Sequence, residues 1–335
     1  MPRRRTKDHD LPQRVYRRHG AVYLALRDGT WHRLGKEWDL EAKLAWARLT
    51  GDKPAPGTLG AVMTRYLELA KPRLAPRTWS DYSEAIALLR KVFGGMQPDE
   101  VTSADVAEYL ERGLEAGRAV RANREIAALS AVFQLAMRKG QATRNPCYGV
   151  ARNPEKPRTR LVTREELAAF VEWARTQGFA GGLMAAAAEI QYLTAQRPGD
   201  VRRIRLQDLT EAGVAFAQAK TGVRVVVGWT ERLQAAVEAA KGLKRGKGVV
   251  AFALLGNRQG QVYTEAGWKA SWSKLMRDWV AAGHERFRQQ DLRPAGVTEL
   301  REKGRAAEEV SGHRQRATVD RIYDRRRIRK APAVD

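Results

Sequence analysis

The sequence has one cysteine, few histidines and no long apolar run, and each scarcity removes a class of protein. The single cysteine, Cys147, excludes an internal disulfide and a zinc site built from several cysteines, as in a reducing cytoplasm. We expect this thiol to be inert. No apolar stretch approaches the roughly 20 residues that a transmembrane helix needs, and residues 1–7 lack the apolar core of a signal peptide. We therefore expect a cytoplasmic protein without membrane attachment.

Acidic residues are also scarce relative to basic ones. Lys and Arg number 61 against 38 Asp and Glu, which gives a net charge of +23 and a pI near 10.5. A surface with this excess favours an anionic polymer as partner. The length of 335 residues allows two or three domains rather than one continuous core.

The chain divides by pattern into four segments. Residues 1–55 mix basic residues with β-like runs at 21–26 and 31–34, joined by a turn, and a short helix is expected at 39–49. Residues 58–150 have helical periodicity, as in the series Tyr82, Ala85, Ile86, Leu89 and Phe93. Residues 151–160 combine prolines and positive charges and predict a basic, extended linker.

The last segment, 161–335, is expected to be mostly helical. Thr163 with Glu166 forms a capping-box pattern at its start. Two β-like runs, 214–219 and 223–227, flank Lys220-Thr221-Gly222 and predict a β-hairpin. The predicted fold class is mainly α with small β elements (α+β).

Several cationic side chains lie where a phosphodiester could be bound. A guanidinium fork matches the planar oxygens of a phosphate with two charge-assisted hydrogen bonds, which a lysine cannot do. Arg197 follows an apolar helix and precedes a short one that Pro198 can start, and Asp200 is close enough in sequence to orient it. Arg293 lies where another helix begins, and Lys220 lies at the hairpin tip, from which a flexible ammonium could reach a cleft.

His313 and Tyr323 lie among arginines near the C-terminus. A free tyrosine is a weak nucleophile at neutral pH, but fixed cations nearby would favour the phenolate and stabilise charge at phosphorus. Tyr323 is therefore a candidate nucleophile, and a half-buried packing role is the alternative.

Taken in order, these motifs resemble the tyrosine recombinase family, specifically the phage-type integrases. The family's first arginine and its acidic neighbour fall on Arg197 and Asp200, and its hairpin lysine on Lys220. The second arginine box falls on residues 291–293, the Gly-His pair on Gly312 and His313, and the nucleophile on Tyr323. The resemblance implies an arm-type β module (1–55), a helical core-binding domain (58–150), the linker (151–160) and a catalytic domain (161–335).

Three features depart from the family pattern. Gln290 stands where a histidine is usual, and an amide can donate a hydrogen bond but cannot act as a base. The spacing from His313 to Tyr323 is one residue longer than in most members, and Pro198-Gly199 lies inside the first box.

The resemblance implies a mechanism and partners. Tyr323 would attack DNA to form a 3′-phosphotyrosyl link, with Arg197, Arg293 and His313 on the phosphorane oxygens. Lys220 would protonate the leaving oxygen, Asp200 would hold Arg197, and Gln290 would add a neutral hydrogen bond. No cofactor or essential metal is implied, and the expected partners are double-stranded DNA at core-type and arm-type sites, a homotetramer on DNA, and possible host DNA-bending and excision factors. The implied reaction integrates or excises a mobile element in a bacterial cell.

Basic residues outside the catalytic set are candidate DNA contacts. These candidates are Arg3, Arg4, Arg5, Arg121, Arg124, Arg138, Lys139, Arg152, Lys156, Arg158 and Arg160.

Two other functions stay open at the level of sequence. A catalytically decayed DNA-binding regulator of recombination is favoured only by Gln290. A metal-dependent hydrolytic nuclease would need paired carboxylates, and no obvious Asp/Glu cluster provides them. A covalent protein–DNA adduct would separate the recombinase from the regulator, and chelator-insensitive cleavage would exclude the metal-dependent nuclease.

Overall fold

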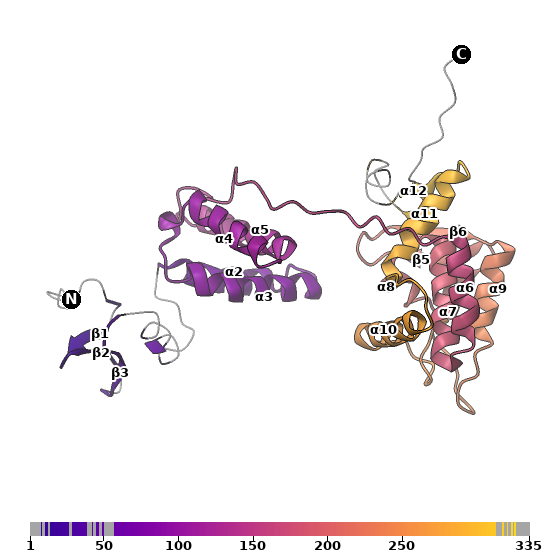
Figure 1. The fold of residues 1–335 in the computed structure, drawn as a ribbon, viewed down its shortest axis with the longest axis horizontal. Helices are drawn as coiled ribbons and strands as arrows, with labels where there is room; N and C mark the ends of the chain where they lie inside the picture. The colour runs from indigo at the N-terminus through magenta and orange to yellow at the C-terminus, as the bar shows by residue number, and fades with distance from the viewer. Residues whose placement is uncertain are drawn as a thin grey trace, which may run out of the picture. The chain divides into compact units, whose positions relative to one another are not determined.

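The computed structural model describes residues 57–312 without a gap. It also describes parts of the N-terminal region (8, 11–12, 14–26, 29–38, 42, 45–46 and 49) and residues 317, 320, 323 and 325. The chain divides into two compact units, Met1–Lys156 and Pro157–Asp335, and each is described by itself (Figure 1). Among the described residues, no helix is both long enough and apolar enough to span a membrane.

The first unit begins with a small antiparallel sheet of β1 (Val15–Arg18), β2 (Ala21–Ala25) and β3 (Trp31–Gly35), in that order. His19 and Gly20 join β1 to β2, and both have positive φ, as a tight type I′ turn requires. The expected N-terminal sheet is confirmed. It contains one strand, β1, that lies outside the two predicted runs, 21–26 and 31–34. Its apolar cluster consists of the buried residues Leu11, Val15, Val22, Leu24, Leu34 and Ala42.

Helices follow in the same unit. They are α2 (Leu59–Ala70), α3 (Pro76–Phe93), the 3-10 turn η1 (Pro98–Glu100), α4 (Ser103–Glu115) and α5 (Ala119–Arg138). The apolar residues whose spacing predicted these helices point inward, and Ile86, Leu89, Ile126 and Phe133 are fully buried. A second apolar cluster therefore lies between these helices.

The second unit is organised around α7 (Gly178–Thr194), a helix that is apolar on nearly every face. It is in contact with α6 (Arg164–Arg175), α9 (Glu231–Lys241), α10 (Glu265–Ala281) and α11 (Leu292–Glu302) (Figure 1). Alanines at 185–188 let these neighbours approach closely, and all four are buried. Phe170, Trp272, Trp279 and Phe287 form an aromatic cluster in this core.

Short elements complete the second unit. The sheet has β4 (Leu209–Thr210), β5 (Gly213–Ala217) and β6 (Arg224–Gly228) in antiparallel order, so the predicted hairpin is present with one short extra strand. The remaining short helices are α8 (Pro198–Val201), η2 (Leu206–Asp208), η3 (Gln289–Asp291) and α12 (Ala307–Ser311). The overall prediction of a mainly helical protein with small β elements is confirmed.

Candidate active site

Arg197 is placed by an abrupt change of direction at the end of α7. Ala195 adopts the left-handed conformation (φ 50°), which ends the helix, and Pro198 starts α8 in its first turn. Arg197 itself is extended between the two helices. Its side chain is 22% exposed, and its Nη1 donates to the side-chain oxygen of Gln218 at 2.9 Å.

Asp200 joins the first arginine box to the hairpin. Its Oδ1 accepts from Arg203 Nη2 at 2.7 Å and from the main-chain N–H of Ala219 at 3.2 Å. Its Oδ2 lies 4.0 Å from Arg197 Nη1, the longer of its two arginine contacts. Asp200 therefore supports Arg197 electrostatically while it bonds directly to Arg203 and to the residue before Lys220.

Arg293 is in the first turn of α11 and is 2% exposed. Its Nη2 donates to the main-chain carbonyl of Ser311 at 2.9 Å. Burial lowers the pKa of Arg293, and the charge of Arg197 lowers it further, while Tyr323 and Asp200 act in the opposite direction. Because arginine starts from a very high pKa, the group stays cationic at neutral pH, so two positive charges lie close together in this region.

Tyr323 lies against Arg293. The guanidinium carbon of Arg293 is 5.3 Å from the centre of the tyrosine ring, a cation–π contact. Thr298 on α11 holds the same segment, because its hydroxyl donates to the carbonyl of Tyr323 at 3.3 Å and accepts from the N–H of Arg325 at 3.1 Å. The nucleophile candidate is thus held by the helix that carries the second arginine.

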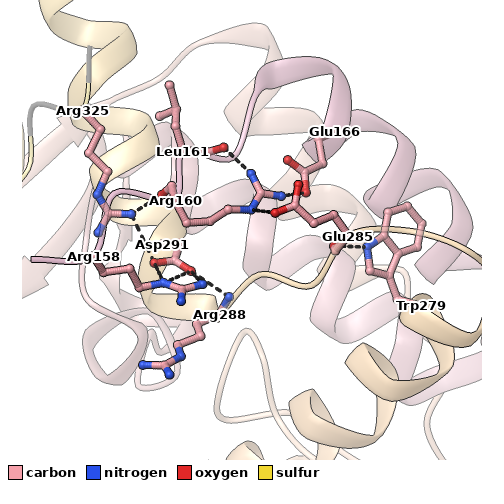
Figure 2. A network of polar contacts seen from close by, with 9 residues as sticks. All are labelled: Arg158, Arg160, Leu161, Glu166, Trp279, Glu285, Arg288, Asp291 and Arg325. Carbon is pink, nitrogen blue, oxygen red and sulfur yellow. Dashed lines mark hydrogen bonds and ion pairs between the residues drawn. The ribbon is translucent and has the colours of Figure 1, made fainter. Parts of the chain in front are cut away.

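A buried carboxylate connects this region to the end of the linker (Figure 2). Asp291 is 1% exposed and accepts from Arg158 Nε at 2.8 and 2.9 Å, from Arg325 Nη1 at 3.2 Å and from the N–H of Arg288 at 2.9 Å. Burial alone would raise the pKa of Asp291, but these hydrogen bonds outweigh it and hold the pKa below its usual range. Arg325 also donates to the carbonyl of Arg160.

A hollow of about 420 Å³ brings several predicted residues together. Arg197, Gln290, Arg293 and Tyr323 all line it. Lys220 does not line it and is exposed in the turn between β5 and β6. His313 lies outside the described residues, directly after Gly312 in the chain. The remaining lining residues are Arg158, Pro198, Arg288, Asp291, Pro294 and Arg325.

The predicted DNA contacts differ in how far their charges are already engaged. Arg124, Arg138, Lys139, Arg152 and Lys156 are exposed. Arg121 is paired with Glu125 at 3.1 Å although its side chain is 59% exposed. Arg158 is held by Asp291, and Arg160 pairs with Glu166 and Glu285. Arg3, Arg4 and Arg5 lie outside the described residues.

Sequence reasoning missed three groups that shape the site. Gln218, Thr298 and Arg325 contact candidate catalytic residues or the backbone beside them. A signal existed for Gln218, which lies two residues before the hairpin lysine, and for Arg325, which lies two residues after Tyr323. Chemically, two arginine forks and a phenol at one hollow can hold a phosphodiester and present an oxygen nucleophile to it.

Comparison with known proteins identifies the class. The phage integrase family matches residues 160–329, and the phage integrase central domain matches residues 59–153. The chain is 26% identical to the integrase of Enterobacteria phage 434 over 266 residues, 70% of each protein. It is 25% identical to the integrase of Escherichia phage lambda over 258 residues, 68% of each.

The fold of this chain resembles those of solved integrase structures. A lambda integrase tetramer bound to a Holliday junction matches with a TM-score of 0.69 at 19% identity, over 98% of this chain and all of that one. The Tn1549 transposon integrase in complex with circular intermediate DNA matches with a TM-score of 0.63 at 16% identity, over 78% of this chain and 94% of that one. Because the family match covers residues 160–329, more than half of the chain, the chain belongs to the phage integrase family, the phage-type tyrosine recombinases of site-specific DNA recombination.

Proposed function

We propose that Tyr323 is the nucleophile of this recombinase and that Arg197 and Arg293 bind the phosphate it attacks. The observation that supports this assignment best is the hollow lined by all three, with the Arg293 guanidinium against the Tyr323 ring. Two fixed cations stabilise the charge that develops on the non-bridging oxygens.

In the proposed step, the hydroxyl of Tyr323 loses its proton to solvent, and its oxygen forms a bond to phosphorus as the bond from phosphorus to the 5′ oxygen breaks. The product is a 3′-phosphotyrosyl link and a free 5′-hydroxyl. Lys220 gives a proton to the leaving oxygen, for which the exposed hairpin turn has to bring its ammonium to the hollow. Attack by the 5′-hydroxyl of another strand reverses the chemistry and rejoins the DNA.

The supporting roles are assigned to neighbours of these groups. Asp200 supports Arg197 and fixes the base of the hairpin through Ala219. His313 is proposed to contact the same phosphate, and Gln290, which lines the hollow, to give it a neutral hydrogen bond.

We further propose the partners and the division of labour along the chain. The protein binds double-stranded DNA in the bacterial cytoplasm and works as a homotetramer on two duplexes, as in the lambda integrase structure on a Holliday junction. Residues 58–150 and 161–335 bind the core sites, residues 151–160 link them, and the β module of residues 1–55 binds arm sites. The reaction integrates or excises a mobile element, with host bending and excision factors as possible partners.

Covalent trapping tests the proposal. Nicked duplexes from a random-sequence pool are incubated with the full chain, and protein–DNA adducts are isolated under denaturing conditions. Wild-type protein is expected to form an adduct whose linked residue is Tyr323, and Tyr323→Phe to bind the recovered duplex equally well without forming one. An adduct from the Phe variant would contradict the assignment, and no adduct from either protein would favour a DNA-binding regulator.

A further inference from the structure

Gln218 occupies a position that no catalytic role explains. It follows β5, is 1% exposed, and uses its amide in four hydrogen bonds to four residues of the second unit. Its Nε2 donates to Gln196 Oε1 and to the carbonyl of Ser311, both at 2.8 Å. Its Oε1 accepts from Arg197 Nη1 at 2.9 Å and from the hydroxyl of Thr221 at 2.8 Å.

The orientation of this amide is fixed by its surroundings. Gln196 Nε2 donates to the carbonyls of Thr194 and Val310, at 3.1 and 2.7 Å, so its Oε1 is left to accept. The carbonyl of Ser311 can only accept. The amino group of Gln218 must therefore face these two acceptors, and its oxygen must face Arg197.

The same carbonyl of Ser311 also accepts from Arg293 Nη2 at 2.9 Å. Arg197 and Arg293 are thus joined through one amide and one carbonyl. Their charges repel each other, as the effect of Arg197 on the pKa of Arg293 indicates, so something has to hold them at the separation that a phosphate needs. A neutral amide does this without neutralising either cation.

Given the proposed roles of the two arginines, we infer that Gln218 is a positioning residue that sets the placement of the Arg197 guanidinium relative to that of Arg293. Gln218 acts through Arg197 and touches no substrate. A close approach from the other side supports this, because a Cβ built on Gly312 would lie 2.5 Å from Gln218 Nε2. Gly312 also has φ of +68°, and a side chain there would push the amide out of place.

A double-mutant cycle tests the inference. The rate of adduct formation is measured on the nicked duplex captured by the wild-type chain, where product accumulates irreversibly and slow rates stay measurable. Gln218→Leu is expected to slow the rate about 100-fold, as for a misplaced phosphate-binding group. In an Arg197→Ala background the same change is expected to slow it no more than about threefold, because no guanidinium is left to position.

Two further variants separate positioning from loss of stability. Leu275→Ala removes a buried side chain on α10 and provides the matched destabilised control. Its effect on the rate of adduct formation should be independent of Arg197, so the losses of Leu275→Ala and Arg197→Ala should multiply in the double variant. Gly312→Ala leaves Gln218 in the chain but displaces its side chain. The rate loss that this change causes should also be smaller in the Arg197→Ala background. The DNA affinities of Gln218→Leu, Gly312→Ala and Leu275→Ala should match that of wild type, which verifies folding.

If the rate loss of the double variant equals the product of the losses of Gln218→Leu and Arg197→Ala alone, the inference is overturned. Gln218 would then have a merely structural role. If Arg197→Ala cleaves as fast as wild type, the proposed role of Arg197 fails and the inference fails with it. Absence of any wild-type adduct would instead refute the proposed function, so the failures are distinguishable.

Discussion

Among the catalytic candidates that the structure describes, Lys220 alone is exposed and does not line the hollow. Arg197, Arg293 and Tyr323 line the hollow, while Lys220 is exposed in a turn. The two residues before Lys220 are anchored, Gln218 to Arg197 and Ala219 to Asp200. The base of the hairpin is thus anchored to the first arginine box while its tip stays exposed. This arrangement suits a group that is needed only when the leaving oxygen takes up a proton.

Substrate chemistry can isolate that proton transfer. Lys220→Ala is expected to slow cleavage of an ordinary phosphodiester by about 100-fold or more, within the usual contribution of a general acid. A duplex with sulfur in place of the 5′ bridging oxygen should be cleaved at nearly the wild-type rate, because a thiolate leaves without protonation. Adduct formation on the two duplexes measures this, with Arg197→Ala as the control that sulfur should not rescue. Equal losses on both substrates would remove Lys220 as the acid.

Gln290 should matter far less than the arginines. It is exposed, lines the hollow and can supply only a neutral hydrogen bond. Gln290→Ala is therefore expected to slow adduct formation about fivefold, in line with about 1 kcal/mol for such a bond. A loss as large as that of Arg293→Ala would show that the amide has a larger part in the reaction than its chemistry suggests.

At the scale of elements, local sequence signals predicted local structure well. The side chain of Thr163 caps α6 by accepting from the N–H of Glu166 at 3.2 Å, and the hairpin around Lys220 is present. The capping-box pattern was only half right, because the carboxylate of Glu166 pairs with Arg160. An arginine six residues upstream competes for that carboxylate, and periodicity carries no information about such a partner.

Asp291 shows how one carboxylate couples three elements. It joins the end of the linker through Arg158, the start of α11, and the chain after Tyr323 through Arg325 (Figure 2). We call these contacts of Asp291 the Asp291 junction. Asp291→Asn should weaken this junction by about 2 kcal/mol, because two arginines lose their charged partner. Hydrogen exchange of the Arg288 amide, which donates to Asp291, reports the loss directly.

The pH dependence of this junction has a definite sign. The folded-state pKa of Asp291 lies below its ordinary value, so its stabilising contribution is full above the unfolded pKa of about 3.9 and is lost as pH falls through the folded one. Protection of the Arg288 amide in the wild type should therefore decrease toward the Asp291→Asn level in strong acid only. A difference between the two proteins that already vanishes at pH 5 would contradict the charged junction.

The same junction should affect the nucleophile. Arg325→Ala removes one partner of Asp291 close to Tyr323, and we expect slower adduct formation with unchanged DNA affinity. Because both residues act in one contact, Asp291→Asn should add little further loss to Arg325→Ala. Independent, multiplying effects would mean that Asp291 and Arg325 support the site by separate routes.

At the scale of the whole molecule, the sequence predicted the class of partner, the set of catalytic candidates and one supporting residue, Asp200. It did not predict the supports Gln218, Thr298 and Arg325. Gln218 meets Ser311 across 93 positions, and Arg158 meets Asp291 across 133. Such pairs depend on how helices pack, which local patterns do not encode. The arginines could be named because phosphate chemistry requires them, whereas an amide that positions an arginine has no chemical signature of its own.

Net charge gives a final prediction about DNA binding. With a charge of +23, affinity should fall steeply with salt through release of counterions. Exposed Arg124 and Arg138 should each contribute about one unit to the slope of log affinity against log salt, so alanine variants should lower it by that amount. Arg158→Ala should change the slope less, because its guanidinium is already held by Asp291. Fluorescence anisotropy with a labelled duplex between low and physiological salt measures the slopes, and a full unit lost with Arg158→Ala would mean that DNA displaces Asp291.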